Sequence, residues 1–334
     1  MKELGVYKQL VQLPYLVSYK KVLEAAISLD LFSQLETAKT AETLAGEMGW
    51  NEANTKHILE AVYSLGFLER NGEEFKNNAD SSKYLVKDSP SYMGSVLLFF
   101  GQNQGMDPGD VARQVREGGQ MPEQMQQMEQ AIDFAAYGDM MREAQSGIRQ
   151  QEVVDLIRSL PENESISSFL DLGCGAGMIG LAIAKDKEDR KVTFFDMPNM
   201  KELVDGSVEK SGIADRCTCM YGDFLKDDIG SGYDMILCSS IMFFAMMDLP
   251  GFMKKLYGSV NDSGVVVCIN EGIALDASEP WEMILGYLPM KMMGMPVGVP
   301  EGMVGQAAQQ AGFKVENRTL LLSTGTHDIN ILRK

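Results

Sequence analysis

The sequence predicts an α/β protein with a mainly parallel sheet in its larger C-terminal part and a smaller, mainly helical N-terminal part. From residue 166 onwards, short apolar runs alternate with helical patterns, which is typical of consecutive β–α–β units. The apolar run 166–172 leads into a glycine-rich turn at 173–177, and an apolar helix face follows the turn. Earlier residues instead show helical spacing, with a single strand–turn–strand pattern.

The N-terminal part has the pattern of a winged helix over residues 40–86. Thr40 can cap a helix that Gly49 ends, and Asn51 can open a second helix. The run FLERNGEEFKN follows as strand, Asn-Gly turn and strand. Upstream of it, residues 6–35 carry apolar residues at helical spacing.

A winged helix often binds DNA, but the charge of this one argues against that role. Residues 1–85 contain nine Lys or Arg and twelve acidic residues, and the second helix offers only Lys56 and His57, flanked by Glu52 and Glu60. A helix that binds in the major groove of DNA needs a basic face. The net charge of the whole chain, −17, also disfavours nucleic acid and anionic membranes as partners.

Length and composition indicate a folded protein of two domains. The chain has 334 residues, of which 45% are hydrophobic. Five cysteines without a repeated spacing favour a reducing compartment, and the single residue between Cys217 and Cys219 is not a zinc spacing, so no metal site is expected. Without an apolar run of membrane length or a signal-peptide pattern, we expect a soluble cytoplasmic protein.

Seven strands are expected in the C-terminal part. Alternation with helices makes five of them parallel, at 166–172, 191–195, 217–221, 233–238 and 264–269. The last two, 313–322 and 326–334, are separated only by a short turn, Ser323-Thr324-Gly325, so they should pair antiparallel. The pattern thus predicts a seven-stranded sheet with a reversed last strand.

The glycine turn is the first candidate binding site. Gly173, Gly175 and Gly177 let the backbone turn tightly and approach a ligand, and the first N–H groups of the following helix would face that ligand. The frame from Gly175 to Gly180 fits the dinucleotide pattern GxGxxG, but this pattern alone is weak evidence. The glycines therefore predict a nucleotide-like ligand without deciding which one.

Acidic residues at three successive strand ends favour S-adenosylmethionine (SAM) over NAD. Asp171 lies two residues before Gly173, where it would repel a pyrophosphate but not the cationic amino acid part of SAM. Asp196 ends the next strand and can accept hydrogen bonds from both ribose hydroxyls. Asp223 follows the third strand and can accept a hydrogen bond from the amino group of adenine. Three acids at these positions are a more specific signal than the glycines.

Together with these acids, the motifs FFDMP at 194–198 and YGDF at 221–224 resemble those of class I SAM-dependent methyltransferases. The sequence is most similar to the small-molecule O-methyltransferase family that carries an N-terminal winged-helix dimerisation domain, over nearly the whole chain. The resemblance implies a Rossmann-like seven-stranded sheet with an antiparallel last strand, SAM as cofactor and S-adenosyl-L-homocysteine (SAH) as product. It also implies cofactor contacts from Met197, Phe224 and Ser239.

The resemblance also implies the domain plan and the assembly. Residues 1–98 would form the dimerisation domain and residues 99–334 the methyltransferase domain. Within the latter, residues 99–160 would be a helical linker and substrate cap. The protein would be a homodimer, with its first helix buried against the second subunit, although the pattern also fits an ordinary core helix.

The sequence departs from the family at the catalytic base. Many members have a histidine after the fourth strand, in a motif like LHDW, but in this chain Phe243 occupies that position. The only histidines are His57 and His327, and we expect neither at a strand end facing the cofactor. Glu271, at the end of the fifth strand, is the remaining candidate. It could be a weak base, bind substrate, or be a solvated strand-end carboxylate.

The acceptor pocket is expected to be apolar. Trp281 and Met290 lie in the methionine-rich stretch 279–303, where the family closes the site, and the helical cap would add Tyr137 and Met141. The resemblance places Phe243 there too. Flexible methionines suit a bulky hydrophobic ligand, although core packing is an equal alternative for each.

These features together predict methyl transfer from SAM to a hydrophobic small molecule. Transfer to oxygen, sulfur or carbon would occur by proximity, without the histidine of the family. The alternative is a sensor or scaffold protein that binds SAM without turnover. The same acids would bind SAM in that case too.

Overall fold

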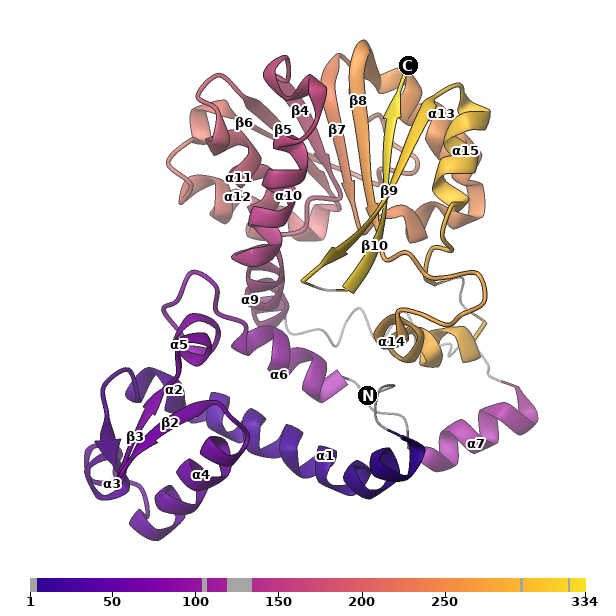
Figure 1. Cartoon of the computed structure of the whole chain (residues 1–334). Coiled ribbons are helices and arrows are strands. Elements are labelled where there is room, and N and C mark those ends of the chain that lie inside the picture. Colours follow the sequence, from indigo (N-terminus) through magenta and orange to yellow (C-terminus); the bar gives the residue numbers. More distant parts are fainter. Residues whose placement is uncertain (1–4, 104–106, 119–133, 295–296, 324) are drawn as a thin grey trace. The chain divides into compact units, whose positions relative to one another are not determined.

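The computed structural model describes residues 5–103, 107–118, 134–294, 297–323 and 325–334. The chain divides into two compact units, 1–104 and 105–334 (Figure 1). The expected domain boundary after residue 98 falls within a helix, Gly94–Asn103, that belongs to the first unit. Part of the predicted cap, 119–133, lies outside the described residues.

The first unit contains the predicted helices and hairpin. Its elements are α1 (Val6–Ser28), α2 (Leu31–Gln34), β1 (Lys39–Thr40), α3 (Ala41–Met48), α4 (Glu52–Ser64), β2 (Leu68–Asn71), β3 (Glu74–Asn77), α5 (Ala79–Leu85) and α6 (Gly94–Asn103). The Thr40 hydroxyl caps α3 by accepting from the Thr43 N–H at 3.1 Å, and the Asn51 side chain caps α4 in the same way. The three strands pair antiparallel in the order β1-β3-β2.

The core of the first unit lies between α2, α3, α4 and the hairpin, where Phe32, Leu44, Leu59 and Phe75 are buried. Of the 23 residues in α1, only Ala26 and Ile27 are buried. Val22 and Leu23 pack partly against this core, and the ring centroid of Tyr19 lies 6.2 Å from that of Phe67. Nearer the start of α1, apolar side chains such as Leu10, Leu13 and Val17 are exposed.

The second unit contains the large sheet and its covering helices. The helices are α7 (Pro108–Glu117), α9 (Phe134–Gln145), α10 (Ile148–Arg158), α11 (Met178–Asp186), α12 (Lys201–Glu209), α13 (Leu249–Ser259), α14 (Trp281–Met292) and α15 (Met303–Ala311). The strands are β4 (Ser168–Leu172), β5 (Lys191–Asp196), β6 (Cys217–Tyr221), β7 (Tyr233–Ser239), β8 (Val260–Asn270), β9 (Lys314–Leu322) and β10 (Gly325–Arg333).

The seven strands of this sheet have the order β6-β5-β4-β7-β8-β10-β9. The first five are parallel, and β10 is antiparallel to both β8 and β9, which confirms the predicted reversed last strand. Two bounds differ from the prediction by more than one residue, since β4 begins at Ser168 and β8 already at Val260. Because β10 runs backwards, its first residues lie at the edge where the parallel strands end, with Asp328 opposite Asn270.

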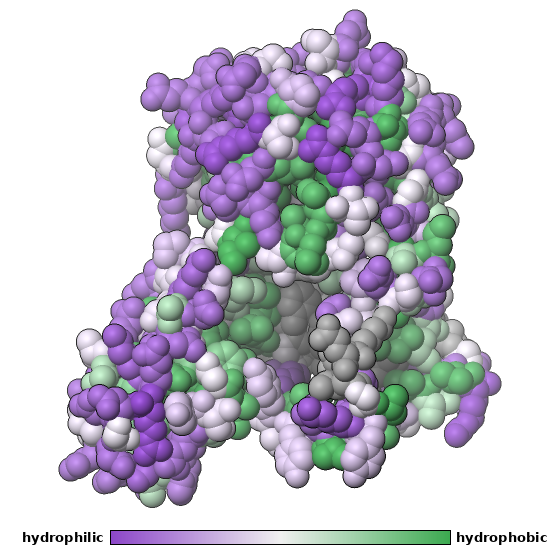
Figure 2. Space-filling view, in the orientation of Figure 1, coloured by the Kyte–Doolittle hydropathy of each residue, from purple (hydrophilic) through white to green (hydrophobic). Residues whose placement is uncertain are grey.

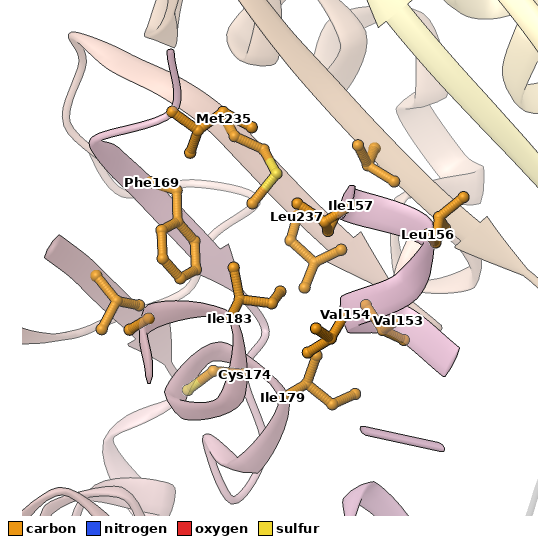
Figure 3. Packing of buried hydrophobic residues seen from close by; sticks show 14 of the residues in the cluster. Val153, Val154, Leu156, Ile157, Phe169, Cys174, Ile179, Ile183, Met235 and Leu237 are labelled. Atoms are coloured by element: carbon orange, nitrogen blue, oxygen red, sulfur yellow. The ribbon is translucent and has the colours of Figure 1, made fainter. Parts of the chain in front are cut away.

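Helices cover both faces of the large sheet. On one face, α10 and α11 pack Val153, Ile157, Ile179 and Ile183 against strand residues such as Leu237 (Figure 3). On the other face, α13 packs on β8 and α15 on β9 and β10, with Leu170, Ile236 and Val266 of the central strands in the same apolar cluster. Hydrophilic residues cover most of the surface visible in Figure 2, with apolar patches between them. Of the helices in the described ranges, none combines the length and apolar character needed to span a bilayer.

Candidate active site

The glycine turn between β4 and α11 has the backbone conformation that the sequence suggests. Gly173, Gly175 and Gly177 have φ angles of 66°, 58° and 75°, in the left-handed region that favours glycine. The Gly173 N–H donates to the Phe195 carbonyl at 2.8 Å, which ties the turn to β5. A Cβ added to Gly173 would stand 2.6 Å from the side chain of Ile241, so this glycine is required for space as well.

Asp196, the last residue of β5, holds the glycine turn. One carboxylate oxygen accepts the Gly175 N–H at 2.7 Å, and the other accepts the Met197 N–H at 2.7 Å. Burial raises the pKa of Asp196, while these two hydrogen bonds oppose the shift. Each oxygen keeps a further lone pair, so the carboxylate can still accept from two ligand hydroxyls. The side chain of Met197 itself is exposed.

Asp171 in β4 is a second buried acid beside the turn. Its carboxylate is 3% exposed and accepts the Gly180 N–H at 3.1 Å. Burial raises the pKa of Asp171 to about 7; the Gly180 hydrogen bond opposes this shift and the charge of Asp196 adds to it. A Cβ added to Gly180 would stand 2.5 Å from the carboxylate, so the helix start fits closely around it.

The third predicted acid lies on the same edge in a more open place. Asp223 follows β6, is half-buried, and pairs with Lys226 at 2.8 Å. Phe224 is buried, with its ring centroid 6.1 Å from that of Phe244 and 5.9 Å from that of Phe252. Because β6, β5 and β4 are neighbours in the sheet, the three acids share one edge as predicted.

Helix α9 covers the glycine turn through Gln145, a residue that no sequence pattern singled out. The Gln145 amide donates to the Cys174 carbonyl at 2.9 Å and accepts the Met178 N–H at 3.2 Å, so it bridges the turn and the start of α11. Met141 lies against the same turn, since its methyl group would stand 2.6 Å from a Cβ on Gly175.

Tyr137, one helical turn before Met141, is half-buried. Burial raises its pKa, and the charge of Asp196 adds to the shift, which places the phenol near that acid. Both predicted cap residues therefore lie on the side of the edge that holds the acids.

Glu271 lies at the opposite side of this edge, directly after β8. It is 9% exposed, which contradicts the alternative of a solvated strand-end carboxylate. Burial raises its pKa; a hydrogen bond from the Tyr287 hydroxyl of α14 and the positive charge of Arg149 lower it in part. Tyr287 is a site residue that sequence reasoning missed, because it is one of many apolar or aromatic residues in α14.

Arg149, in the first turn of α10, is a second site residue that sequence reasoning did not select. It is 8% exposed, and its Nη2 lies 3.4 Å from the Ser239 hydroxyl at the end of β7. Burial lowers its pKa, and the charges of Glu152 and Glu271 oppose the shift. An arginine in an amphipathic helix carries no local signal of burial, so only the packing of α10 against the sheet shows its place.

His327 lies at this edge of the sheet, on the side away from the acids of β4 and β5, so the expectation that it does not face the cofactor stays a prediction. This residue is the third of β10, and because β10 is antiparallel, its start lies beside the end of β8. It is 4% exposed, and its Nδ1 lies 2.8 Å from the Gly325 carbonyl. Burial lowers its pKa; the hydrogen bond to Gly325 opposes this, and the charge of Arg149 adds to it. His57 is in the first unit.

The predicted pocket residues do not all converge. Phe243 is half-buried after β7, with its ring centroid 3.8 Å from that of Phe244. Trp281 and Met290 are nine residues apart in α14, so they lie on opposite sides of that helix. Met290 shares a side with Tyr287, which bonds to Glu271, whereas Trp281 is 39% exposed.

The residues at the acidic side of the edge fit SAM. Two buried carboxyl groups, Asp171 and Asp196, flank the glycine turn, and such a pair suits a cationic amino acid group and a ribose diol. The same pair would repel a pyrophosphate. The donor and acceptor set therefore agrees with SAM and disagrees with a dinucleotide.

The raised pKa of Asp171 predicts a pH-dependent stability. An acid whose pKa is higher in the folded than in the unfolded state destabilises the protein as pH rises through that interval, here from about 4 to about 7. Asp171→Asn keeps the shape and removes the charge, so thermal melts without ligand should show a gain in unfolding free energy over wild type of up to about 4 kcal/mol at pH 8 and little gain at pH 4. Asp262→Asn, at an exposed carboxyl, is the control. Parallel pH profiles for wild type and Asp171→Asn would contradict the assignment.

Two family models match the chain. One, described as an O-methyltransferase dimerisation domain, matches residues 12–88, and one described as a lysine methyltransferase matches residues 140–275. The second match contains the glycine turn, the three acids and Glu271.

Similar proteins cover most of the chain. An uncharacterised protein of Methanocaldococcus jannaschii is 25% identical over 291 residues, 85% of this chain and 74% of that protein. The bacteriochlorophyllide d C-20 methyltransferase of Chlorobaculum tepidum is 23% identical over 323 residues, 93% and 89% of the two chains. The crystal structure of human N-acetylserotonin methyltransferase with SAM superposes with a TM-score of 0.77 at 20% identity, over 99% of both chains.

The fold, the fit of the glycine turn and its acids to SAM, and the two family matches lead to one assignment. The chain is a SAM-dependent methyltransferase with a Rossmann-like fold, and its N-terminal part matches an O-methyltransferase dimerisation domain.

Proposed function

We propose that the protein methylates a hydrophobic small molecule at the edge where the parallel strands end, without a histidine at the usual place of the family. The observation that supports this most strongly is the division of that edge. The ends of β4 and β5 carry the acids suited to SAM, and the adjoining ends of β7 and β8 carry Ser239 and the buried Glu271–Tyr287 pair. SAM supplies an activated methyl group, and an acceptor held over β7 and β8 would lie next to it.

The acceptor class is inferred from the segments outside the lysine methyltransferase match. That match ends at residue 275, before α14 and α15, and does not include the dimerisation domain. Relatives that share those segments are named for a bacteriochlorophyllide and for N-acetylserotonin, which are small molecules with large apolar parts. Acceptor oxygen, nitrogen and carbon all occur among the relatives' names, and sulfur remains our own extension.

The roles of the individual residues follow from their places. We propose that Asp196 binds the ribose, that Asp171 faces the methionyl ammonium group, and that Gly173, Gly175, Gly177, Met197 and Asp223 complete the cofactor site with Phe224 and Ser239. Glu271 would take the proton of the acceptor, because burial makes its carboxylate a better base than a solvated one. Tyr137, Met141, Phe243 and Met290 would line the pocket, with Trp281 at its rim.

Residues 1–98 would form a winged-helix dimerisation domain, and residues 99–160 would connect it to the site. Apolar side chains of α1 are exposed, among them Leu10, Leu13 and Val17, which follow one another at helical spacing. Between α1 and α4 lies a groove of about 420 Å³, lined mainly by apolar atoms. We infer that a second copy covers this surface in a homodimer with an interface above roughly 2,000 Å². A cytoplasmic location fits the five free thiols.

The substrate class can be tested with a library of hydrophobic small molecules and a second library of lysine-containing peptides, both incubated with SAM. We expect SAH formation that depends on a small molecule, and none above background with the peptides. Methylation of peptides alone would overturn the acceptor class. Tight SAM binding with no turnover on either library would favour the alternative, a sensor or scaffold protein.

The base can be tested by comparing Glu271→Gln with His327→Gln. Glu271→Gln keeps the shape of the side chain, so kcat should fall by roughly 10²–10⁴-fold with little change in SAM affinity. His327→Gln should cost less than about tenfold, because burial and the charge of Arg149 make this imidazole a weak base. His57→Ala, in the first unit, is the control. A larger loss from His327→Gln would make His327 the base instead.

The dimer can be tested by sedimentation velocity at micromolar concentration. The wild type should sediment as a dimer, and the double change Leu10→Glu, Leu13→Glu should give a monomer, since two charges would be buried in an apolar interface. Asn54→Glu adds a charge at an exposed position of α4 and should leave the dimer intact. A monomeric wild type would refute the proposed assembly.

A further inference from the structure

Arg149 is a buried cation without an ionic partner in the part of the chain that the structure describes. Its side chain is 8% exposed, and no carboxylate oxygen of the described residues lies within 4.0 Å of its nitrogens. Its hydrogen bond to the Ser239 hydroxyl is long, at 3.4 Å, and its Nη1 is buried without a partner among the described residues. Buried charges in proteins are normally paired, because leaving a charged donor unsatisfied is costly.

Another buried arginine in the same unit shows the normal arrangement. Arg190 is fully buried, and its Nη2 donates to the carbonyl and side-chain oxygens of Asn163 at 2.8 and 2.6 Å. Its Nη1 lies 3.3 Å from Asp186. The fold can therefore satisfy a buried guanidinium, and it leaves Arg149 unsatisfied at the edge where ligands are expected.

The carboxylates nearest to Arg149 are bound elsewhere. Glu152, one turn later in α10, accepts from the Ser323 N–H at 2.6 Å and from its hydroxyl at 2.9 Å. Glu271 accepts a hydrogen bond from the Tyr287 hydroxyl. Both are near enough for their charges to act on Arg149, but neither forms an ion pair with it. An anionic oxygen from outside the chain would complete this site.

We propose that Arg149 binds an anionic oxygen of the methyl acceptor, so that the acceptor is an acid: a carboxylate, or a phenol or enol that ionises readily. The inference rests on the proposed function and specifies its substrate class. Guanidinium binds such oxygens with two N–H groups in one plane, and the long contact to Ser239 lets the group turn towards a ligand at little cost.

The carboxylate of SAM has the same chemistry, but the surroundings of Arg149 favour the acceptor. Ser239, which we assign to the cofactor site, touches Arg149 on one side. The charged and titratable groups that face it are Glu271 after β8, His327 on β10 and Glu152 on its own helix. The acids suited to SAM lie on the other side of the edge, on β4 and β5.

Binding measurements on the full chain with SAH present test this inference without turnover. The probes are benzoate, 2-naphthoate and 9-anthroate, each paired with its primary amide, and the readout is the dissociation constant from calorimetry. Wild type should bind at least one acid tenfold or more tightly than its amide. Arg149→Met should abolish this preference, Arg149→Lys should keep part of it, and Arg158→Met, at an exposed position of the same helix, should keep all of it.

The same variants distinguish the two sources of the carboxylate. Affinities for SAH and for 5′-methylthioadenosine, which lacks the amino acid group, should change less than threefold in Arg149→Met. A loss confined to SAH would assign Arg149 to the cofactor and overturn the inference, as would equal binding of acids and amides by the wild type. In that last case the proposed function stands, whereas failure of every probe to bind would contradict both.

Thermal melts separate binding from folding. Since the described residues leave the charge of Arg149 unpaired, Arg149→Met should not lower the melting temperature. A lower melting temperature with all ligands weakened equally would show a structural role and would refute the proposed recognition of the acceptor.

Discussion

The hydrogen bond from the Gly175 N–H to the Asp196 carboxylate is the interaction on which the cofactor side of the site depends. It joins the end of β5 to the turn that follows β4, and the Met197 N–H holds the other oxygen of the same carboxylate. A left-handed backbone at three glycines makes the turn possible, and Gln145 covers it from α9. The acid is thus oriented before any ligand binds, which reduces the free energy needed to order the site.

The reversed direction of β10 decides the composition of the other side. In a sheet of parallel strands only their carboxyl ends would meet at this edge. Because β10 is inserted antiparallel between β8 and β9, its amino end contributes His327 beside the end of β8, where the charge of Arg149 on α10 acts on it. The reversed strand therefore adds a histidine to an edge where β8 and α10 already supply a carboxylic acid and a guanidinium.

Buried ionisable groups concentrate at this edge, and they lower the stability of the fold there. Asp171 has a pKa of about 7, Glu271 has a raised pKa, and Arg149 has no ion pair among the described residues. Arg190, away from the edge, is fully paired. Strain of this kind, confined to one edge, is characteristic of binding and catalytic sites, where perturbed groups are retained for their chemistry.

The sequence by itself determined the features that depend on near neighbours in the chain. Helix caps at Thr40 and Asn51, the alternation of strands and helices, and the glycine turn with its acids are all local patterns, so they were predictable. Only the tertiary structure decided the places of Arg149 and His327 and the burial of Glu271. Arg149 meets Ser239 across 90 residues, and such contacts depend on strand direction and helix packing, which no local pattern encodes.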